Sequence, residues 1–343
     1  MRTYLLPKEG KFYKANLHCH TNVSDGHLSP EEVKREYMEK GYSIIAYTDH
    51  DIMIPHPELA EEGFLPMVGY EMEINRKDFP EQTCHLCFVG LRPDVRQVCW
   101  HREKYLPVSS AKYRHLAKFD ETLPDFEREY THACINEMIR RGVEEGFFVT
   151  YNHPTWSLES YENYMSYEGM HAMEIVNYSS MTVGFDDYNP RVYDDMLRAG
   201  KRIFCSAADD NHNHKPKDSP EYDSFGGFNM IKSEKLDYDS IGDALVKGDF
   251  YASEGPEIYE LYAECSELDE HSFKIYISCS DASKITLSTE RRPAWVAFPQ
   301  AGEPLKEATF TVGDKYKYFR LTVTDKAGKH ACTRAYFLDE LAK

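Results

Sequence analysis

The chain has 343 residues, of which 40 are lysine or arginine and 58 are aspartate or glutamate, so its formal net charge is −18. This charge repels polyanions and argues against a protein that coats nucleic acid, and no run approaches the roughly 18 apolar residues of a membrane-spanning helix. The first residues lack the apolar core of a signal peptide and the nine cysteines are scattered and odd in number, so we expect reduced thiols and a cytoplasmic protein.

Residues 16–51 have the pattern of one β–α–β unit with polar side chains after both strands. His18 and His20 end the first strand, and because side chains alternate across a strand, both point the same way and could share a metal. A serine N-cap followed by proline and two glutamates at 29–32 marks the start of the helix. The second strand, 42–47, runs into a T-D-H-D sequence. Both polar clusters therefore follow the carboxyl ends of strands, where α/β folds build their sites.

Strand and helix patterns alternate along the following two hundred residues. Strands are expected at 64–74, 85–91, 147–151, 173–177, 202–207 and 227–231, and helices at 131–146, 191–199 and 240–247. This alternation predicts a parallel α/β barrel or sheet. The segment 92–130 interrupts it with charged and aromatic residues. A loop of this length often serves as a lid or specificity element, and a peripheral helix is an equally good interpretation.

The pattern changes near Gly255-Pro256, where we expect the boundary between a domain of residues 1–255 and a domain of residues 256–343. The second domain consists of short, alternating runs rich in β-branched and aromatic residues, separated by turn residues. Such runs are typical of a small all-β sandwich. Its two histidines, His271 and His330, are isolated, so we assign it no chemistry.

Nine polar side chains are expected at one rim of the predicted sheet. They are His18, His20, Asp25, His50, Glu71, His85, His153, Asp210 and His212. Six histidines and three carboxylates are too many for one four-coordinate zinc, but they suit two or three divalent metals with a bridging carboxylate. Each histidine alone could be a satisfied polar residue near a strand end, whereas the whole set favours a metal centre. Mixed ligands of this kind suit zinc, manganese and iron (Zn, Mn or Fe) alike.

Taken in order, these motifs resemble the PHP (polymerase and histidinol phosphatase) superfamily, in its branch of small metal-dependent phosphoesterases. The resemblance rests on H-x-H-T-x-x-S-D-G, T-D-H-D, G-x-E, N-H-P and D-x-H within residues 15–255. It implies a TIM-like, distorted seven-stranded β/α barrel, and some members carry a similar C-terminal Ig-like domain. It also implies three metal sites: His18, His20, Glu71 and Asp210; Asp25, His50 and His212; and Glu71, His85 and His153. The last motif departs from the family's G-S-D-x-H, which leaves Asp209 as an alternative to Asp210.

The resemblance implies an enzyme that hydrolyses a small phosphate ester, a phosphomonoester such as a nucleotide or metabolite phosphate, by hydroxide generated on the metals. A phosphodiesterase or another hydrolase on the same metals is the alternative, and a non-catalytic metal-dependent binding protein is an alternative of another class. We expect a small phosphorylated partner rather than a nucleic-acid polymer or a membrane. The sequence does not indicate an oligomeric state.

Five residues beside the motifs are candidates for further roles. Asp51 could orient a ligand or shuttle a proton, and a structural role as a turn cap is an equal alternative. The candidates for phosphate contact are His27, Arg76, His214 and Lys215, although any surface loop could contain such residues.

Overall fold

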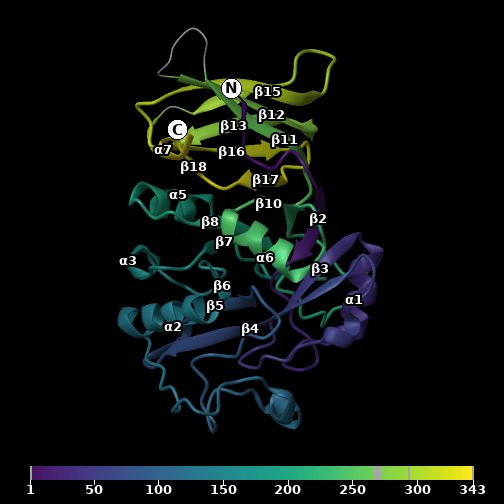
Figure 1. Cartoon of the computed structure of the whole chain (residues 1–343), viewed down its shortest axis with the longest axis vertical. Helices are drawn as coiled ribbons and strands as arrows, with labels where there is room; N and C mark the ends of the chain where they lie inside the picture. The colour runs from purple at the N-terminus through teal and green to yellow at the C-terminus, as the bar shows by residue number, and fades with distance from the viewer. Residues whose placement is uncertain (1, 266–271, 293, 342–343) are drawn as a thin grey trace.

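The computed structural model describes residues 2–265, 272–292 and 294–341. Within these residues the strands form one large mixed sheet and one four-stranded sheet. Figure 1 shows an α/β region below and an all-β region above, with the large sheet reaching into both. No helix in the described part of the chain has the length and apolar character needed to cross a membrane.

Seven strands form the frame of the α/β region and lie side by side in chain order. They are β2 (Lys11–Asn16), β3 (Tyr42–Tyr47), β4 (Leu65–Arg76), β5 (Phe79–Gly90), β6 (Phe147–Tyr151), β7 (Ala172–Asn177) and β8 (Phe204–Ala208). β2, β3 and β4 are parallel to one another, and so are β6, β7 and β8, whereas β5 is antiparallel to both of its neighbours. The predicted strand 85–91 is therefore the second arm of a long hairpin, and the sheet is mixed rather than parallel.

The two ends of this run of strands approach each other through a few specific hydrogen bonds. β9 (Phe228–Ser233) is antiparallel to β2, and the side chain of its Asn229 bonds the backbone of Ala207 in β8. Beyond the strands, the His20 N–H donates to Asn211 O at 3.1 Å and the Asp210 N–H donates to His18 O at 3.0 Å. No backbone ladder joins β8 to β9 or β2 among the described residues, so the structure shows a mixed sheet, and its closure into a seven-stranded barrel stays a prediction. These bonds bring the segments after β2 and β8 to one rim.

Most of the helices pack around these strands, and the last one lies in the all-β region (Figure 1). They are α1 (Pro30–Glu39), α2 (His132–Glu145), α3 (Tyr161–Ser166), α4 (Tyr178–Thr182), α5 (Pro190–Arg198), α6 (Tyr238–Lys247) and α7 (Leu338–Leu341), with 3-10 turns η1 (Pro57–Leu59) and η2 (Val108–Leu116). The predicted start of α1 is confirmed, because Ser29 and Glu32 form a reciprocal capping box. α2 ends, as predicted, at Gly146, which adopts the left-handed φ of 106° that a glycine accepts without strain.

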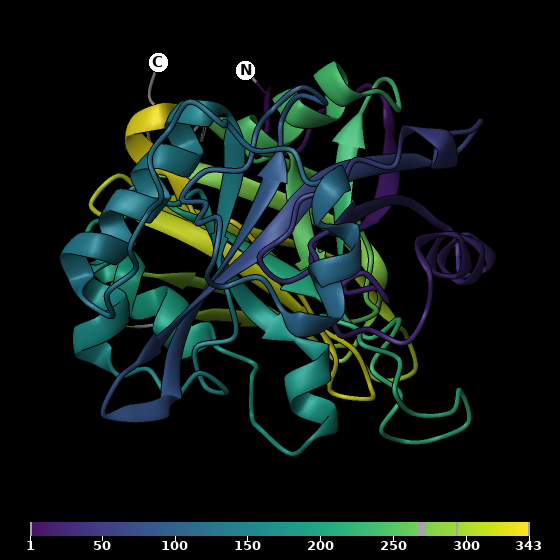
Figure 2. The same cartoon turned by 90° about the horizontal axis from the view of Figure 1, so that it is seen from below.

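The segment 92–130 contains η2 and is otherwise irregular. Figure 2, seen from below, shows it in front of the α/β region and on the side away from the all-β region. Its Leu106 and Tyr113 pack against a small buried cluster that includes Val23 and Ile52. The segment is therefore anchored to the loops that follow β2 and β3.

The all-β region crosses the boundary predicted at Gly255-Pro256. Its elements are β1 (Arg2–Tyr4), β11 (Ile258–Cys265), β12 (Ser272–Ala282), β13 (Lys284–Thr289), β14 (Trp295–Ala297), β15 (Leu305–Gly313), β16 (Tyr318–Thr324), β17 (His330–Thr333) and β18 (Tyr336–Phe337). β1, from the amino-terminal end, pairs with β11, and β10 (Phe250–Ser253) pairs with β17. Strands on both sides of the boundary therefore share hydrogen bonds, and the division into domains stays a prediction.

Buried polar contacts also join the all-β region to α5 and its surroundings. Arg320 Nε lies 2.8 Å from Asp194 Oδ1, and the arginine side chain is buried. The Tyr193 hydroxyl donates to Ile203 O and accepts from the Ala335 N–H, both at 3.1 Å. Loss of the all-β region would remove the Arg320 partner of Asp194 and the N–H donor to Tyr193 Oη, which is costly for buried polar atoms.

Truncation after Gly255 is expected to yield a chain that aggregates or loses cooperative unfolding, because β1 would lose β11, β10 would lose β17 on one edge, and the Tyr193 surface would be exposed. Size-exclusion chromatography and thermal unfolding followed by circular dichroism, with the full chain as control, measure this. A monomeric remainder with cooperative unfolding would instead identify the all-β region as a separable accessory.

Candidate metal centre

Glu71 of β4 lies at the centre of the predicted rim and is buried. Its Oε1 is 3.2 Å from His18 Nε2 and 3.1 Å from His85 Nδ1. Its Oε2 is 3.3 Å from His20 Nε2 and 3.2 Å from His50 Nδ1. Four imidazoles from the segments after β2 and β3 and from β5 thus face one carboxylate. This arrangement suits a carboxylate that bridges metal ions.

Asp210 completes the most buried group of candidate ligands. Its Oδ1 lies 3.0 Å from the Nε2 atoms of both His18 and His20. The group consists of His18, His20, Glu71 and Asp210, whose ligand atoms all lie within 4.8 Å of one another. Asp209 instead turns away and accepts hydrogen bonds at 2.8 Å from Tyr37 Oη and the backbone N–H of Gly226. Of the two adjacent aspartates, the structure brings Asp210 to the histidines.

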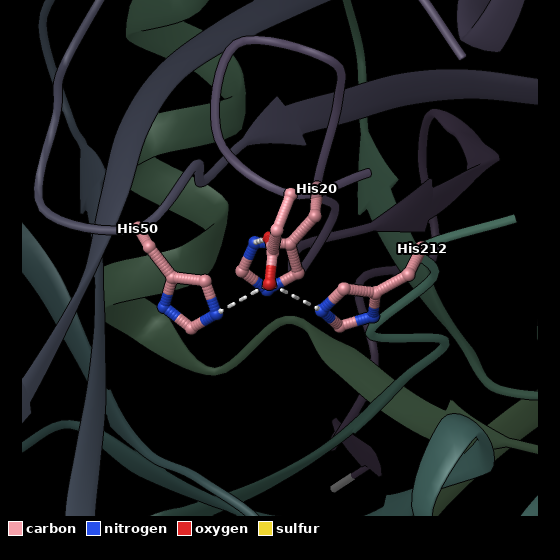
Figure 3. Close-up of side chains that lie close together, drawn as sticks. His20, His50 and His212 are labelled. Carbon is pink, nitrogen blue, oxygen red and sulfur yellow. Dashed lines mark ion pairs between the residues drawn. The ribbon is translucent and has the colours of Figure 1, made fainter. Parts of the chain in front are cut away.

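A second group lies at the open side of the site and contains His20, Asp25, His50 and His212, again with ligand atoms within 4.8 Å. Asp25 Oδ2 is 3.6 Å from the Nε2 atoms of His50 and His212, and these ion pairs are drawn in Figure 3. Figure 3 also shows the three imidazoles turned toward one another, with His20 between the other two. The Asp25 side chain is 47% exposed, so a solute can reach this group from outside.

The third group consists of His50, Glu71 and His85, and His153 adjoins it with Nε2 3.3 Å from Glu71 Oε1. His50 belongs to two groups because its Nε2 faces Asp25 and its Nδ1 faces Glu71. If His50 serves the outer group and His20 serves the inner one, the third group keeps Glu71, His85 and His153. The nine predicted residues then divide among three positions without using any histidine twice.

Several of these histidines are oriented by a second partner on the far side of the ring. His18 Nδ1 lies 2.7 Å from Glu174 Oε1, His153 Nδ1 lies 3.0 Å from Ser157 Oγ, and His212 Nδ1 lies 2.9 Å from Asp210 O. Such partners fix the tautomer and aim the other nitrogen at a metal. Glu174 also accepts the His153 N–H at 3.0 Å, so it supports two candidate ligands.

Sequence reasoning missed Glu174, which lies in β7 and is buried. A signal was available, because it is the one charged residue in the apolar strand sequence AMEIVN. A buried carboxylate inside such a strand needs polar partners.

Asp49 supports the loop before Asp25. It accepts hydrogen bonds from the Thr21 hydroxyl at 2.8 Å and from the Ser24 hydroxyl at 2.7 Å.

The pKa values of the clustered side chains depend on the charges of their neighbours. Burial raises the pKa of Glu71, but the imidazoles of His18, His85 and His50 outweigh this effect and hold its pKa well below the ordinary glutamate range. Burial and the neighbouring His20 lower the pKa of His50 to about 3, which keeps its imidazole neutral. Divalent metals bind ionised carboxylates and neutral imidazoles, so Glu71 and His50 are in the required states. The raised pKa values of His18 and His20 mean that these two would lose a proton on metal binding.

Some buried histidine nitrogens of the cluster have no hydrogen-bond partner within the described part of the chain, as expected for atoms that face a metal ion. Among the described residues, the buried Nδ1 atoms of His20 and His50 have no hydrogen-bond partner, although Glu71 Oε2 lies 3.2 Å from the latter. Buried polar atoms rarely lack a partner in folded proteins, and a bound cation would supply one. The backbone also accepts strain here, because Asp210 and His153 adopt positive φ values of 54° and 22°.

The profile of the PHP domain matches residues 16–247 of the chain. The chain belongs to the PHP domain family. A 66-residue stretch is 38% identical to a 5′-3′ exoribonuclease of Haemophilus influenzae and covers 18% of this chain, and the match spans about a quarter (24%) of that relative's length.

Two solved structures similar to this PHP-domain chain show low sequence identity. One is a two-domain protein from Bacteroides vulgatus containing a predicted PHP-like metal-dependent phosphoesterase, 16% identical, with a TM-score of 0.46 and coverage of 97% of this chain and 98% of that one. The other is an amidohydrolase from Chromobacterium violaceum with bound sulfate, 17% identical, with a TM-score of 0.39 and coverage of 58% and 87%.

The remaining predicted residues of this PHP-domain chain lie outside the three ligand groups. His27 and His214 are exposed beside His212: the His27 N–H donates to His212 O at 2.7 Å, and the His214 ring stacks on the His212 ring at 6.1 Å. Lys215 Nζ lies 2.6 Å from Glu221, and Arg76 Nε lies 2.7 Å from Asp78 in the β4–β5 hairpin. Both cations are therefore engaged by carboxylates.

Asp51 is buried and forms an ion pair with Arg128, whose Nη2 lies 2.6 Å from Asp51 Oδ1. It belongs to none of the three candidate ligand groups. Its carboxylate is thus paired with a side chain of the insertion 92–130.

Glu174→Gln is expected to lower metal affinity about 10- to 100-fold, because the neutral amide no longer makes a charged bond with His18 Nδ1. Titration of the metal-free protein with Mn²⁺ or Zn²⁺ against a competing chelator measures this change. The exposed neighbour Glu168→Gln is the matched control and should bind as the wild type does. Unchanged affinity in Glu174→Gln would remove Glu174 from the support of the centre.

Proposed function

We propose that this chain is a metal-dependent phosphoesterase that hydrolyses a small phosphate ester, foremost a phosphomonoester such as a nucleotide or metabolite phosphate. The observation that carries the proposal is the set of three overlapping ligand groups around Glu71, one of them open to solvent at Asp25. Membership of the PHP domain family supports the same class of chemistry.

The residues divide into three ligand positions under this proposal. They are His18, His20, Glu71 and Asp210; Asp25, His50 and His212; and Glu71, His85 and His153. Divalent ions held there would lower the pKa of bound water and neutralise phosphoryl oxygens. Two or three ions, with Glu71 bridging, are compatible with this division, and mixed histidine and carboxylate ligands suit zinc, manganese and iron.

The chain's own residues give the site an inner and an outer side. His18, His20 and Glu71 are almost fully buried and exclude bulk solvent from the inner position, where electrostatic interactions are strong. Asp25 and His212 face outward, so the ester enters from their side and its leaving group stays near the opening. His27 and His214 flank this opening and are the chain's candidates for contact with the phosphate.

Two features of the chain's charge support the requirement for metals. Lys215 and Arg76, the basic candidates beside the motifs, are engaged by Glu221 and Asp78. The whole chain carries a net charge of −18. A phosphate dianion therefore needs positive charge inside the site itself, which metal ions would provide.

Hydrolysis of a phosphodiester is the second candidate, favoured by the stretch that is 38% identical to an exoribonuclease. Exoribonucleases cleave phosphodiester bonds, and the same metal arrangement could support either reaction. The alternative of another class, a non-catalytic binding protein, would bind metals without turning over any ester.

The purified chain, loaded with Mn²⁺ or Zn²⁺, is expected to hold two or three metals and to release phosphate faster from monoesters than from diesters. Metal analysis and a panel of nucleotide monoesters, sugar phosphates and diesters measure both properties. Chelation should abolish turnover, and readdition of metal should restore it. Faster cleavage of diesters would favour the second candidate, and fewer than two bound metals with no ester cleaved would contradict an enzyme of either kind.

His50→Ala is expected to lower turnover by at least about 100-fold, because it removes a ligand candidate shared by two groups. Steady-state kinetics, with circular dichroism to verify folding, tests this. His132→Ala is the matched control, since His132 is exposed at the first residue of α2 and lies outside the ligand groups. Wild-type turnover in His50→Ala would exclude His50 from the site.

A further inference from the structure

Arg128 is the side chain by which the insertion 92–130 reaches the candidate metal centre. Its Nη2 lies 2.6 Å from Asp51 Oδ1, and its Nη1 donates to Glu73 O at 2.8 Å. The Arg128 and Asp51 side chains are 3% and 2% exposed. A guanidinium and a carboxylate buried this deeply depend on each other, because removal of one leaves an uncompensated charge.

The two partners of Arg128 adjoin two candidate ligands on different strands. Asp51 directly follows His50, and its N–H donates to Glu71 O at 2.8 Å. Its φ of 56° is left-handed, which aspartate and asparagine adopt more readily than most residues other than glycine. Glu73 lies two residues after Glu71 in β4. Arg128 therefore links the segment that carries His50 to the strand that carries Glu71.

Other residues of the insertion hold the same loops. Gln97 Nε2 donates to Asp51 O at 2.8 Å, and Gln97 Oε1 accepts the Met53 N–H at 3.0 Å. Ser110 Oγ donates to Val23 O at 2.7 Å, in the loop that leads to Asp25. The insertion thus bonds to the backbone of two of the loops that supply the outer ligand group.

We propose that Arg128 is a positioning residue of the metal centre, which sets the placement of His50 against Glu71 by holding Asp51 and Glu73 together. The end of the insertion that carries Arg128 is then a fixed part of the site, because moving it away from Asp51 would separate a buried ion pair. This inference rests on the proposed metal centre but not on the identity of the ester. Under this proposal Asp51 serves as the partner that holds Arg128 in place, and it takes no part in proton transfer.

The double variant Asp51→Asn/Arg128→Met tests the proposal, because it removes both charges at once and leaves no unpaired buried ion. Asparagine also tolerates the positive φ at position 51. We expect its affinity for Mn²⁺ or Zn²⁺, measured by chelator competition, to fall at least about tenfold. Arg128→Lys, which keeps the charge but cannot reach both partners as a fork, is expected to lie between the double variant and the wild type.

The matched control is Arg102→Met/Asp125→Asn, which removes a pair at 2.7 Å that is partly exposed within the same insertion. Its metal affinity is expected to stay within about twofold of the wild type, because neither residue contacts the centre. Wild-type affinity in the double variant, or an equal loss in the control, would overturn the positioning role. If the double variant fails to fold, the proposal depends on Arg128→Lys, and wild-type affinity there would overturn it.

These outcomes are separable from failure of the proposed function. A wild-type chain that binds metals but cleaves no ester would contradict the phosphoesterase, while the affinity comparison would still decide the role of Arg128. An active wild type with unchanged affinity in the folded variants would contradict only the positioning role. A wild-type chain that binds no divalent metal would overturn both.

Discussion

The burial of an ionised carboxylate, Glu71, is the constraint on which the rest of the site depends. Moving a carboxylate out of water costs several kcal/mol unless opposite charges and hydrogen bonds compensate. Here the compensation comes from imidazoles within 3.3 Å of its oxygens. They belong to β5 and to the segments after β2, β3 and β6. Those segments must therefore converge on one point of β4. The mixed strand order places β3 and β5 on either side of β4 and makes that convergence possible.

Backbone hydrogen bonds hold the distant segments together at the site. The parallel bridge between Cys19 and Asn211 joins the residues after β2 to those after β8, and the left-handed φ of Asp210 turns its carboxylate to the histidines. Glu174 then fixes His18 from behind. Strained backbone and buried charge are each unfavourable alone, and they persist because they support one another. A site built this way is buried and hydrogen-bonded at its inner side and is exposed to solvent at Asp25.

Sequence patterns located most elements and identified the residues that gather around Glu71, because strand alternation, helix caps and the H-x-H spacing are local signals. They did not show that β5 is antiparallel, or that β1 and β10 pair with strands of the all-β region. These pairings join residues far apart in the chain, and no local pattern encodes them. The same reason explains Arg128, which was one charged residue among many until the fold brought it to Asp51. The choice between Asp209 and Asp210 also required the backbone geometry.

The distribution of charge bears on the size of the substrate. Screening in physiological salt limits the reach of surface charges to about 8 Å, so a small ester in the site is governed by the local imidazoles and any ions they hold. A polyanion would in addition lie along a surface whose chain carries a charge of −18, and each further phosphate would meet repulsion rather than counterion release. Under the proposed function, the acidic surface therefore favours a ligand short enough to remain within the site.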